Sequence, residues 1–144
     1  MLTKRNYSPE ELTALLQEHG INPTGQRLEI ARLLFARAEH LSADDVFVLV
    51  NKTVTKVSKA TVYNTLGLFA EHGLIRAVIA DPNKVFYDPN TAAHYHFYDV
   101  ASGRLTDIDA DGVRISGLPP PPDDARMEGV DVIIRLRRGD RPVH

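Results

Sequence analysis

The first half of the chain has the spacing of apolar residues that is typical of short amphipathic helices. Ser8 can cap a helix, and Leu12, Leu15 and Leu16 follow it at the i, i+3, i+4 spacing of one helical face. Gly20 suits the end of this helix, because glycine readily adopts the left-handed backbone that often follows a helix. Three more helices are predicted to begin after residues with a capping hydroxyl, which are Thr24, Ser42 and Ser58.

Two short strands are predicted directly after the fourth helix. Residues 74–79 and 84–87 are rich in apolar side chains, and a turn around Pro82 separates them. Helices followed by a two-stranded ribbon are the order of elements in a winged helix-turn-helix, whose last helix enters the major groove of DNA. We therefore predict a reading helix over residues 59–72.

The pattern changes to alternating strands after a turn-rich stretch at residues 88–91. Strands are predicted over 94–100, 104–109 and 130–136, with the proline run 119–122 lying extended between the last two. The predicted fold class is α+β, with a winged helix-turn-helix followed by a second domain that holds a three-stranded sheet. The expected boundaries are 1–87 for the winged helix, 88–93 for a hinge and 94–144 for the second domain.

The second domain is predicted to pair with a second copy of the chain. A domain of about 55 residues with three strands has little core of its own, and pairing would stabilise it. The apolar strand 130–136 is a natural place for this contact. The alternative is an ordinary internal strand with no partner.

Composition limits the classes of protein to which the chain can belong. Hydrophobic residues make up 43% and charged residues 25%, and no apolar run approaches the ~20 residues of a membrane-spanning helix. The N-terminal stretch lacks the apolar segment of a signal peptide, so we expect a cytoplasmic protein. The net charge of −2 means that nucleic-acid binding needs a local basic surface. The absence of cysteine excludes disulfides and thiolate metal sites and leaves imidazole and carboxylate ligands.

The sharpest chemical feature is an H-x-H motif formed by His94 and His96. On a strand, residues i and i+2 point to the same face, so the two imidazoles can share one metal ion. A two-residue turn at 102–103 would place Asp109 opposite His96, with Asp107 diagonal to it on the same face. Nitrogen and oxygen ligands suit Fe(II), Mn(II) or Zn(II). The alternative is a pair of surface histidines without a ligand.

The predicted reading helix and its surroundings carry side chains suited to DNA. Tyr63 can contact a base edge or a thymine methyl group, while basic and hydroxyl side chains can contact phosphates. The alternative is a plain polar outer face. The expected DNA-contacting residues are Arg27, Lys52, Lys56, Lys59, Thr61, Tyr63, Asn64 and Thr65.

Several segments together resemble the ferric uptake regulator family over about residues 12–108. An A-T-V-Y-x-T-L block that is followed by H-x-H at this spacing is highly specific for that family. The segments that carry the resemblance are His40–Val46, Val57–Leu66, Gly73–Ile75, His94–His96 and Gly103–Ile108.

The resemblance implies a winged-helix DNA-binding domain, a C-terminal α/β dimerisation domain and a regulatory divalent metal between them. It implies a homodimer on double-stranded promoter DNA, in which the metal fixes the domain orientation and therefore the spacing of the reading helices. The family's structural zinc is not expected, because the positions of its first cysteine pair are occupied by Asp99 and Ser102. Carried over position by position, the implied metal ligands are His40, Asp88, His94, His96 and Asp107.

Some departures from the family pattern resemble its iron response regulator branch. They are Asn64, the absence of cysteine, the segment 118–122 and the strand 130–138. That branch controls genes of iron and haem metabolism and is implied to respond to haem as well as iron. The possible haem ligands are His94, Tyr95 and His96.

Two alternatives to an iron-responsive regulator stay open from the sequence. One is a repressor that senses peroxide or manganese with the same five ligands. The other is a mononuclear metalloenzyme that uses His94, His96 and Asp107. Such an enzyme would need an open coordination position and a substrate pocket, and the sequence shows no separate nucleophile and base. We therefore predict that the chain is not an enzyme.

Overall fold

The computed structural model of the chain describes residues 6–37, 39–53, 56–92 and 95–137. These residues form two compact units, and the boundary between the units falls between Thr91 and Ala92. Among the residues that the structure describes, none of the helices has the length and apolarity that a membrane span requires.

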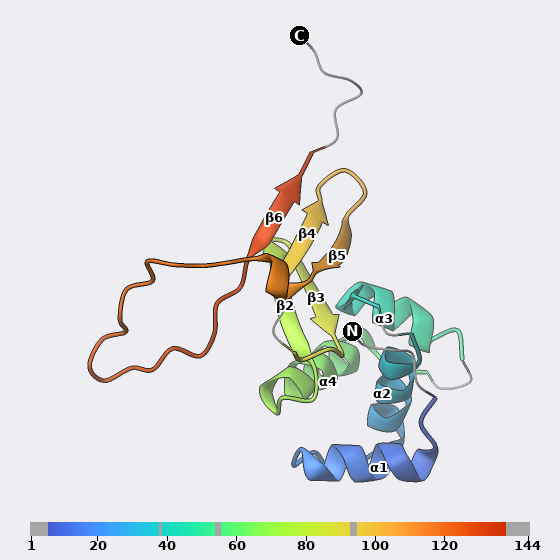
Figure 1. The fold of residues 1–144 in the computed structure, drawn as a ribbon. Coiled ribbons are helices and arrows are strands. Elements are labelled where there is room, and N and C mark those ends of the chain that lie inside the picture. Colours follow the sequence, from blue (N-terminus) through green and yellow to red (C-terminus); the bar gives the residue numbers. More distant parts are fainter. Residues whose placement is uncertain (1–5, 38, 54–55, 93–94, 138–144) are drawn as a thin grey trace. The chain divides into compact units, whose positions relative to one another are not determined.

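The helices of the first unit begin where the capping residues predict (Figure 1). Ser8 and Ser42 each form a reciprocal capping box, in which the serine hydroxyl accepts from the backbone three residues on and an acid side chain returns the bond. Ser58 accepts a hydrogen bond from the backbone N–H of Thr61 at the start of the fourth helix. The described helices are α1 (Pro9–Glu18), α2 (Gly25–Arg37), α3 (Ala43–Val50) and α4 (Lys59–Glu71).

The hydrophobic core of the first unit lies among these helices. One apolar face of each helix supplies it, because residues three and four apart lie on the same side of a helix. Burial of these side chains fixes which face of α4 remains available to solvent. The largest fully buried side chains include Leu16, Ile30, Leu34, Leu66 and Phe69.

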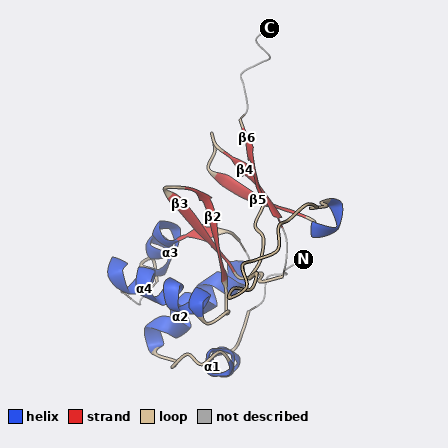
Figure 2. Cartoon of the chain, turned by 90° about the vertical axis from the view of Figure 1, so that its left-hand side faces the viewer, coloured by secondary structure: helices blue, strands red, loops and turns tan. Residues whose placement is uncertain are grey.

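The wing is an antiparallel sheet in the order β1-β3-β2, drawn in red beside the blue helices of this unit in Figure 2. Its strands are β1 (Leu41–Ser42), β2 (Arg76–Asp81) and β3 (Lys84–Asp88). The sequence placed the start of β2 two residues too early, because Leu74 and Ile75 are buried in the helical core before the strand begins. The short strand β1 was not predicted.

The second unit is built on a sheet in the order β5-β4-β6. β4 and β5 are antiparallel, whereas β6 runs parallel to β4. A single turn of 3-10 helix, Ala110–Gly112, follows β5. The strands are β4 (Tyr95–Asp99), β5 (Arg104–Ile108) and β6 (Ile133–Leu136).

A long irregular connection, residues 113–132, joins the 3-10 turn to β6 in this unit. It contains no helix or strand, and it leaves the sheet as a wide loop, coloured orange in Figure 1. The proline run 119–122 lies in this connection and is exposed.

Candidate metal centre and nucleic-acid interface

One imidazole–carboxylate pair lies in the first unit, between His40 and Asp88. β1 pairs with β3 so that Leu41 lies opposite Tyr87, which brings the residue before β1 next to the last residue of β3. The Nε2 atom of His40 lies 3.0 Å from Oδ2 of Asp88, and the side chains are 15% and 5% exposed. Asp88, which we expected in the hinge, is therefore the buried end of a wing strand.

The Asp88 carboxylate is held in one orientation by a second contact. Its Oδ1 atom accepts a hydrogen bond of 2.9 Å from the backbone N–H of Asn90, while Oδ2 faces the imidazole. A buried carboxylate is costly unless donors or a cation compensate its charge. The position is therefore suited to a ligand that is oriented before a metal binds.

A second imidazole–carboxylate pair lies in the second unit, between His96 and Asp107. These residues are direct partners in the β4–β5 ladder, and His96 Nε2 lies 3.3 Å from Asp107 Oδ1. The His96 side chain is 3% exposed and the Asp107 side chain 43%. The predicted register was wrong by two residues, since Asp107 and not Asp109 lies opposite His96. Asp109 instead caps the 3-10 turn by accepting from the backbone N–H of Asp111.

Both pairs offer donors that suit a divalent first-row metal. Each supplies one imidazole nitrogen and one carboxylate oxygen, which is the donor chemistry of Mn(II), Fe(II) and Zn(II) sites without thiolate. In each pair the carboxylate lies close enough to orient the imidazole, a role that also recurs around bound metals. The residues present therefore fit the implied ion. His94, the remaining predicted ligand, lies outside the described residues.

The outer face of α4 carries the aromatic side chain that the sequence singled out. Tyr63 is 43% exposed, and its hydroxyl donates a hydrogen bond of 2.9 Å to Oδ1 of Asp44. The same oxygen lies 3.4 Å from Nζ of Lys59. The hydrogen bond to Asp44 raises the pKa of Tyr63, and that bond together with Lys59 lowers the pKa of Asp44. Asp44 therefore joins the start of α3 to two predicted DNA-contacting residues of α4.

One predicted DNA contact is not supported by the structure. Thr65 is 5% exposed, because it lies on the inner side of α4 next to the core residue Leu66. Asn64 on the same helix is exposed and Thr61 is partly exposed, as a surface that meets DNA requires. Helical spacing was the signal that could have identified it, since Thr65 lies three residues after Val62 and four before Phe69, which are both buried.

The remaining predicted DNA contacts, Arg27, Lys52 and Lys56, also lie in the first unit. An open hollow of about 750 Å³ lies between the start of α2 and α4, and Arg27 and Asn64 both line it. The Arg27 guanidinium donates to the carbonyl oxygen of Asn22 at 2.8 Å. Lys56 donates to the carbonyl oxygen of Asn51 at 2.8 Å, while Lys52 is exposed.

Sequence reasoning missed Asp44 as part of this surface. Its position suggested only a favourable acid in the first turn of α3. The contact with Tyr63 joins residues that lie 19 positions apart, and no local pattern predicts it.

The fold and the two pairs define a winged-helix protein with the donor chemistry of a metal site. The sequence profile of the ferric uptake regulator family matches residues 18–116, and the chain belongs to this family. The peroxide-responsive repressor PerR of Staphylococcus aureus is 32% identical over 99 residues, which cover 69% of this chain and 67% of that protein. The corresponding repressor of Staphylococcus epidermidis is 31% identical over 103 residues, 72% of this chain and 69% of that one.

Solved structures agree with the family assignment. The ferric uptake regulator from Francisella tularensis with iron is 25% identical and has a TM-score of 0.67, covering 83% of this chain and 92% of that one. The regulator from Pseudomonas aeruginosa with manganese has a TM-score of 0.66 at 24% identity, covering 88% and 96%. The predicted fold class, a winged helix-turn-helix with a C-terminal dimerisation domain, is confirmed. The chain is a metal-responsive transcriptional regulator and not an enzyme.

Proposed function

We propose that the chain is a homodimeric regulator of iron-metabolism genes whose affinity for promoter DNA changes when a divalent metal binds. The observation that carries this proposal is the presence of two imidazole–carboxylate contacts, one in each compact unit. The proposed ligands are His40 and Asp88 from the first unit, and His94, His96 and Asp107 from the second.

The ligand set explains how metal binding could change the affinity of the protein for DNA. When bound, a divalent cation supplies positive charge that compensates the carboxylates of both pairs. His40 directly precedes strand β1 of the wing and Asp88 ends strand β3, whereas His96 and Asp107 belong to the sheet of the dimerisation domain. Ligands from both units limit the orientations that the units adopt, and half-site spacing on DNA depends on that orientation.

Metal binding can be tested without DNA. We expect equilibrium dialysis of metal-depleted protein against Mn(II) to give one tightly bound ion per chain. The variants Asp88→Asn and Asp107→Asn should each bind tenfold or more weakly, while Asp109→Asn should bind as the wild type does, because Asp109 caps the 3-10 turn. If Asp109→Asn lost the ion and Asp107→Asn kept it, the proposed ligand set would be wrong.

The exposed face of α4 is the proposed surface for the major groove. Tyr63 and Asn64 project from it, Lys59 lies at its first turn, and Lys52 and Lys56 lie just before the helix. These side chains provide one aromatic group for base contact and several cations for phosphates, although the net charge of the chain is −2. Arg27 and Thr61 complete the proposed set, and Thr65 is left out because it is buried. Promoter binding implies a cytoplasmic location.

We further propose that the chain belongs to the iron response regulator branch and binds haem. The support is the absence of cysteine, Asn64 after the reading tyrosine, and the proline-rich connection before β6. Of the possible haem ligands, His96 is 2% exposed and Tyr95 is partly exposed, so ligation by His96 requires its contact with Asp107 to open. Titration with haem should give a Soret band that the double variant His94→Ala/His96→Ala lacks. An unchanged band in that variant would place haem elsewhere.

A peroxide-sensing repressor is the second candidate, because the similar proteins from Staphylococcus aureus and Staphylococcus epidermidis carry that name. Its distinguishing property would be loss of DNA binding on exposure to hydrogen peroxide when Fe(II) is loaded, but not when Mn(II) is loaded. Unchanged DNA binding of the Fe(II)-loaded protein after exposure to peroxide would favour the iron-responsive function.

A further inference from the structure

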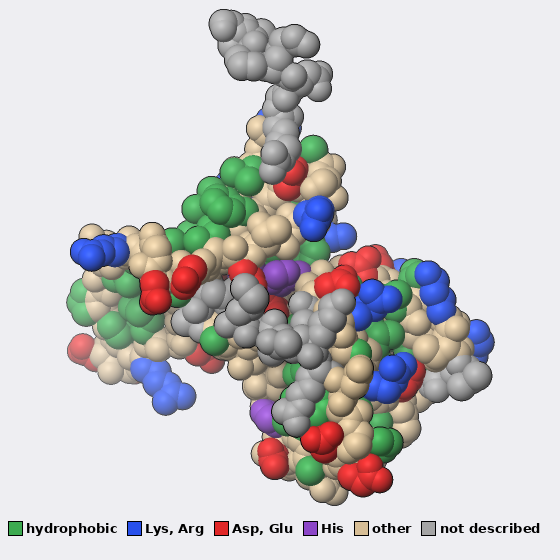
Figure 3. Space-filling model, turned by 45° about the vertical axis from the view of Figure 1, so that its right-hand side comes forward, with side chains coloured by type: hydrophobic (Ala, Val, Ile, Leu, Met, Phe, Trp, Pro, Cys, Tyr) green, Lys and Arg blue, Asp and Glu red, His purple; other side chains and the backbone are tan. Residues whose placement is uncertain are grey.

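The connection between the 3-10 turn and β6 leaves large apolar side chains exposed. We call residues 113–132 the proline segment. Ile115, Leu118 and Met127 are 37%, 48% and 49% exposed there. A loop of this length without helix or strand is uncommon in a compact domain and is usually either functional or disordered. Figure 3 shows green hydrophobic side chains on the projecting loop at left, among acidic and basic ones.

The run Pro119–Pro122 stiffens the middle of the proline segment. Each proline ring fixes the backbone φ angle, and consecutive prolines favour an extended polyproline II conformation. A stiff segment loses little conformational entropy when it docks, and such segments commonly dock on grooves lined by aromatic side chains.

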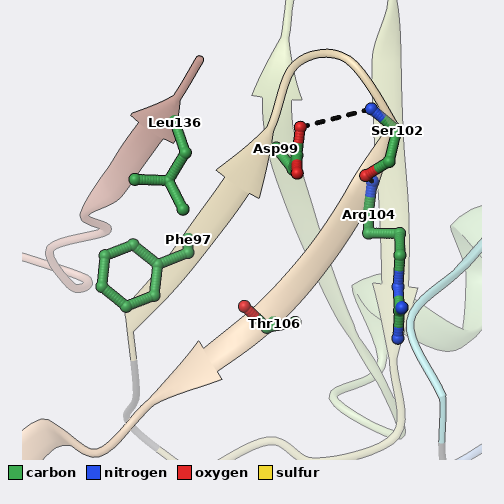
Figure 4. A pocket seen from close by; sticks show the side chains of 6 residues that line it. All are labelled: Phe97, Asp99, Ser102, Arg104, Thr106 and Leu136. Atoms are coloured by element: carbon green, nitrogen blue, oxygen red, sulfur yellow. Dashed lines mark hydrogen bonds between the residues drawn. The ribbon is translucent and has the colours of Figure 1, made fainter. Parts of the chain in front are cut away.

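The sheet of the same unit carries a hollow with one aromatic side chain, Phe97. It has a volume of about 360 Å³ and is lined by Phe97, Leu136 and four polar residues. Phe97 of β4 and Leu136 of β6 lie on neighbouring strands, with Thr106 and Arg104 across from them on β5 (Figure 4). Ile134, the ladder partner of Phe97, is 40% exposed and extends the apolar surface.

The hollow offers a cation to the acidic end of the proline segment. Asp123 and Asp124 directly follow the prolines, and Arg104 lines the hollow. The hollow's own carboxylate, Asp99, accepts hydrogen bonds from the backbone N–H groups of Ala101 and Ser102. Both ends of the segment are attached to the sheet, whereas its middle stands away from that sheet (Figure 1). The apolar side chains of the segment therefore remain exposed within one copy. A second copy offers the same hollow, and reciprocal contacts of this kind satisfy two-fold symmetry.

We propose that the proline segment of one copy docks on the Phe97–Leu136 hollow of a second copy, with Asp123 and Asp124 near its Arg104. This inference rests on the homodimer of the proposed function and adds to it the segment that crosses between the copies. The exchange buries the exposed Leu118 and Met127, and it fixes the segment from which β6 returns to the sheet.

Cross-linking between two differently tagged copies tests the exchange, because the native chain has no cysteine. Leu118→Cys in one copy and Thr106→Cys in the other are co-expressed and treated with a short bismaleimide. We expect a covalent dimer that carries both tags. The control pair Leu118→Cys and Glu10→Cys should not cross-link, because Glu10 is equally accessible but lies on α1 and not on the sheet that carries the hollow. A dimer by sedimentation equilibrium without the first cross-link, or equal cross-linking of the control pair, would overturn the proposal.

Substitutions give an independent readout of the same contact. Leu118→Ser/Met127→Ser should raise the dimer dissociation constant at least tenfold, whereas Arg126→Ser on the same segment should leave it unchanged. Arg104→Glu should weaken the dimer, and Asp123→Lys/Asp124→Lys should restore it. Equal dissociation constants for the double serine variant and the wild type would contradict the exchange. Such a result would leave the measurements of metal binding and DNA binding unaffected. Failure of the proposed exchange can therefore be distinguished from failure of the proposed function.

Discussion

At the scale of single residues, the contact between Asp44 and Tyr63 decides how the reading helix presents its aromatic side chain. The Tyr63 hydroxyl and the Lys59 ammonium meet at the same oxygen of Asp44. A tyrosine that is held in one orientation before DNA arrives loses less freedom on binding than a free one. We therefore expect Asp44 to position Tyr63 on the proposed DNA surface, although the charge of Asp44 itself opposes phosphate.

This contact predicts a measurable shift in the ionisation of Tyr63. The hydrogen bond to Asp44 raises the pKa of Tyr63 above its ordinary value of 10.0, so the stabilisation is present below that pH and lost as the pH rises through the raised pKa. Replacing Asp44→Asn should lower the pKa of Tyr63 in an ultraviolet titration. Glu71→Gln, at the far end of α4, is the control and should leave it unchanged. Identical titrations of Asp44→Asn and wild type would exclude this hydrogen bond in solution.

Removal of the Tyr63 side chain should reduce the sequence selectivity of DNA binding. Tyr63→Ala should weaken binding to a specific promoter fragment by ~1–3 kcal/mol and change non-specific binding much less, if Tyr63 contacts a base. Lys52→Ala should instead weaken both to a similar degree and reduce the salt dependence. Fluorescence anisotropy with the two DNA fragments measures both effects. An equal loss for Tyr63→Ala on both fragments would exclude its proposed role in base contact.

At the scale of elements, the helices could be predicted from the sequence but the β4–β5 register could not. Helix starts depend on a local signal, the capping serine, and all three serine caps are found where the sequence places them. The hairpin depends on turn chemistry that the sequence left open. Asp99 accepts from the backbone N–H groups of Ala101 and Ser102, which lengthens the turn and shifts the register.

Two glycines predict opposite effects of the same substitution. Gly103 has a φ of +72° and nothing near its missing Cβ, so Gly103→Ala should destabilise the protein by ~1 kcal/mol through backbone strain alone. Gly67 lies inside α4 with equally open space and no positive φ, so Gly67→Ala should stabilise by ~0.5–1 kcal/mol. Urea unfolding of both variants checks the signs. A stable Gly103→Ala variant would mean that the turn adopts another conformation in solution.

At the scale of the whole molecule, the resemblance implied a set of ligands, but only the fold shows how four of these side chains pair. Nothing in the sequence predicted β1, and it is the pairing of β1 with β3 that brings His40 to Asp88. Pairings of this kind join distant positions, and local periodicity carries no information about them.

Metal binding should also stabilise the folded chain as a whole. A ligand that binds only the folded state at 100 times its dissociation constant stabilises it by ~2.7 kcal/mol. We therefore expect Mn(II) to raise the melting temperature of the wild type and to have little effect on Asp88→Asn, which lacks the buried carboxylate. Calorimetry with and without Mn(II) measures the difference. An equal increase in both proteins would show that the ion binds elsewhere.

The most direct test of the central claim is DNA binding by fluorescence anisotropy at fixed salt, with a fragment of an iron-regulated promoter. Metal-depleted protein is compared with protein loaded with Mn(II), for the wild type and for Asp88→Asn/His96→Ala. The account predicts that metal changes the affinity of the wild type by about tenfold or more, a coupling of about 1.4 kcal/mol. The double variant should bind DNA with one affinity, whether or not metal is present. A wild type that binds the promoter specifically, but with the same affinity in both states, would contradict the account.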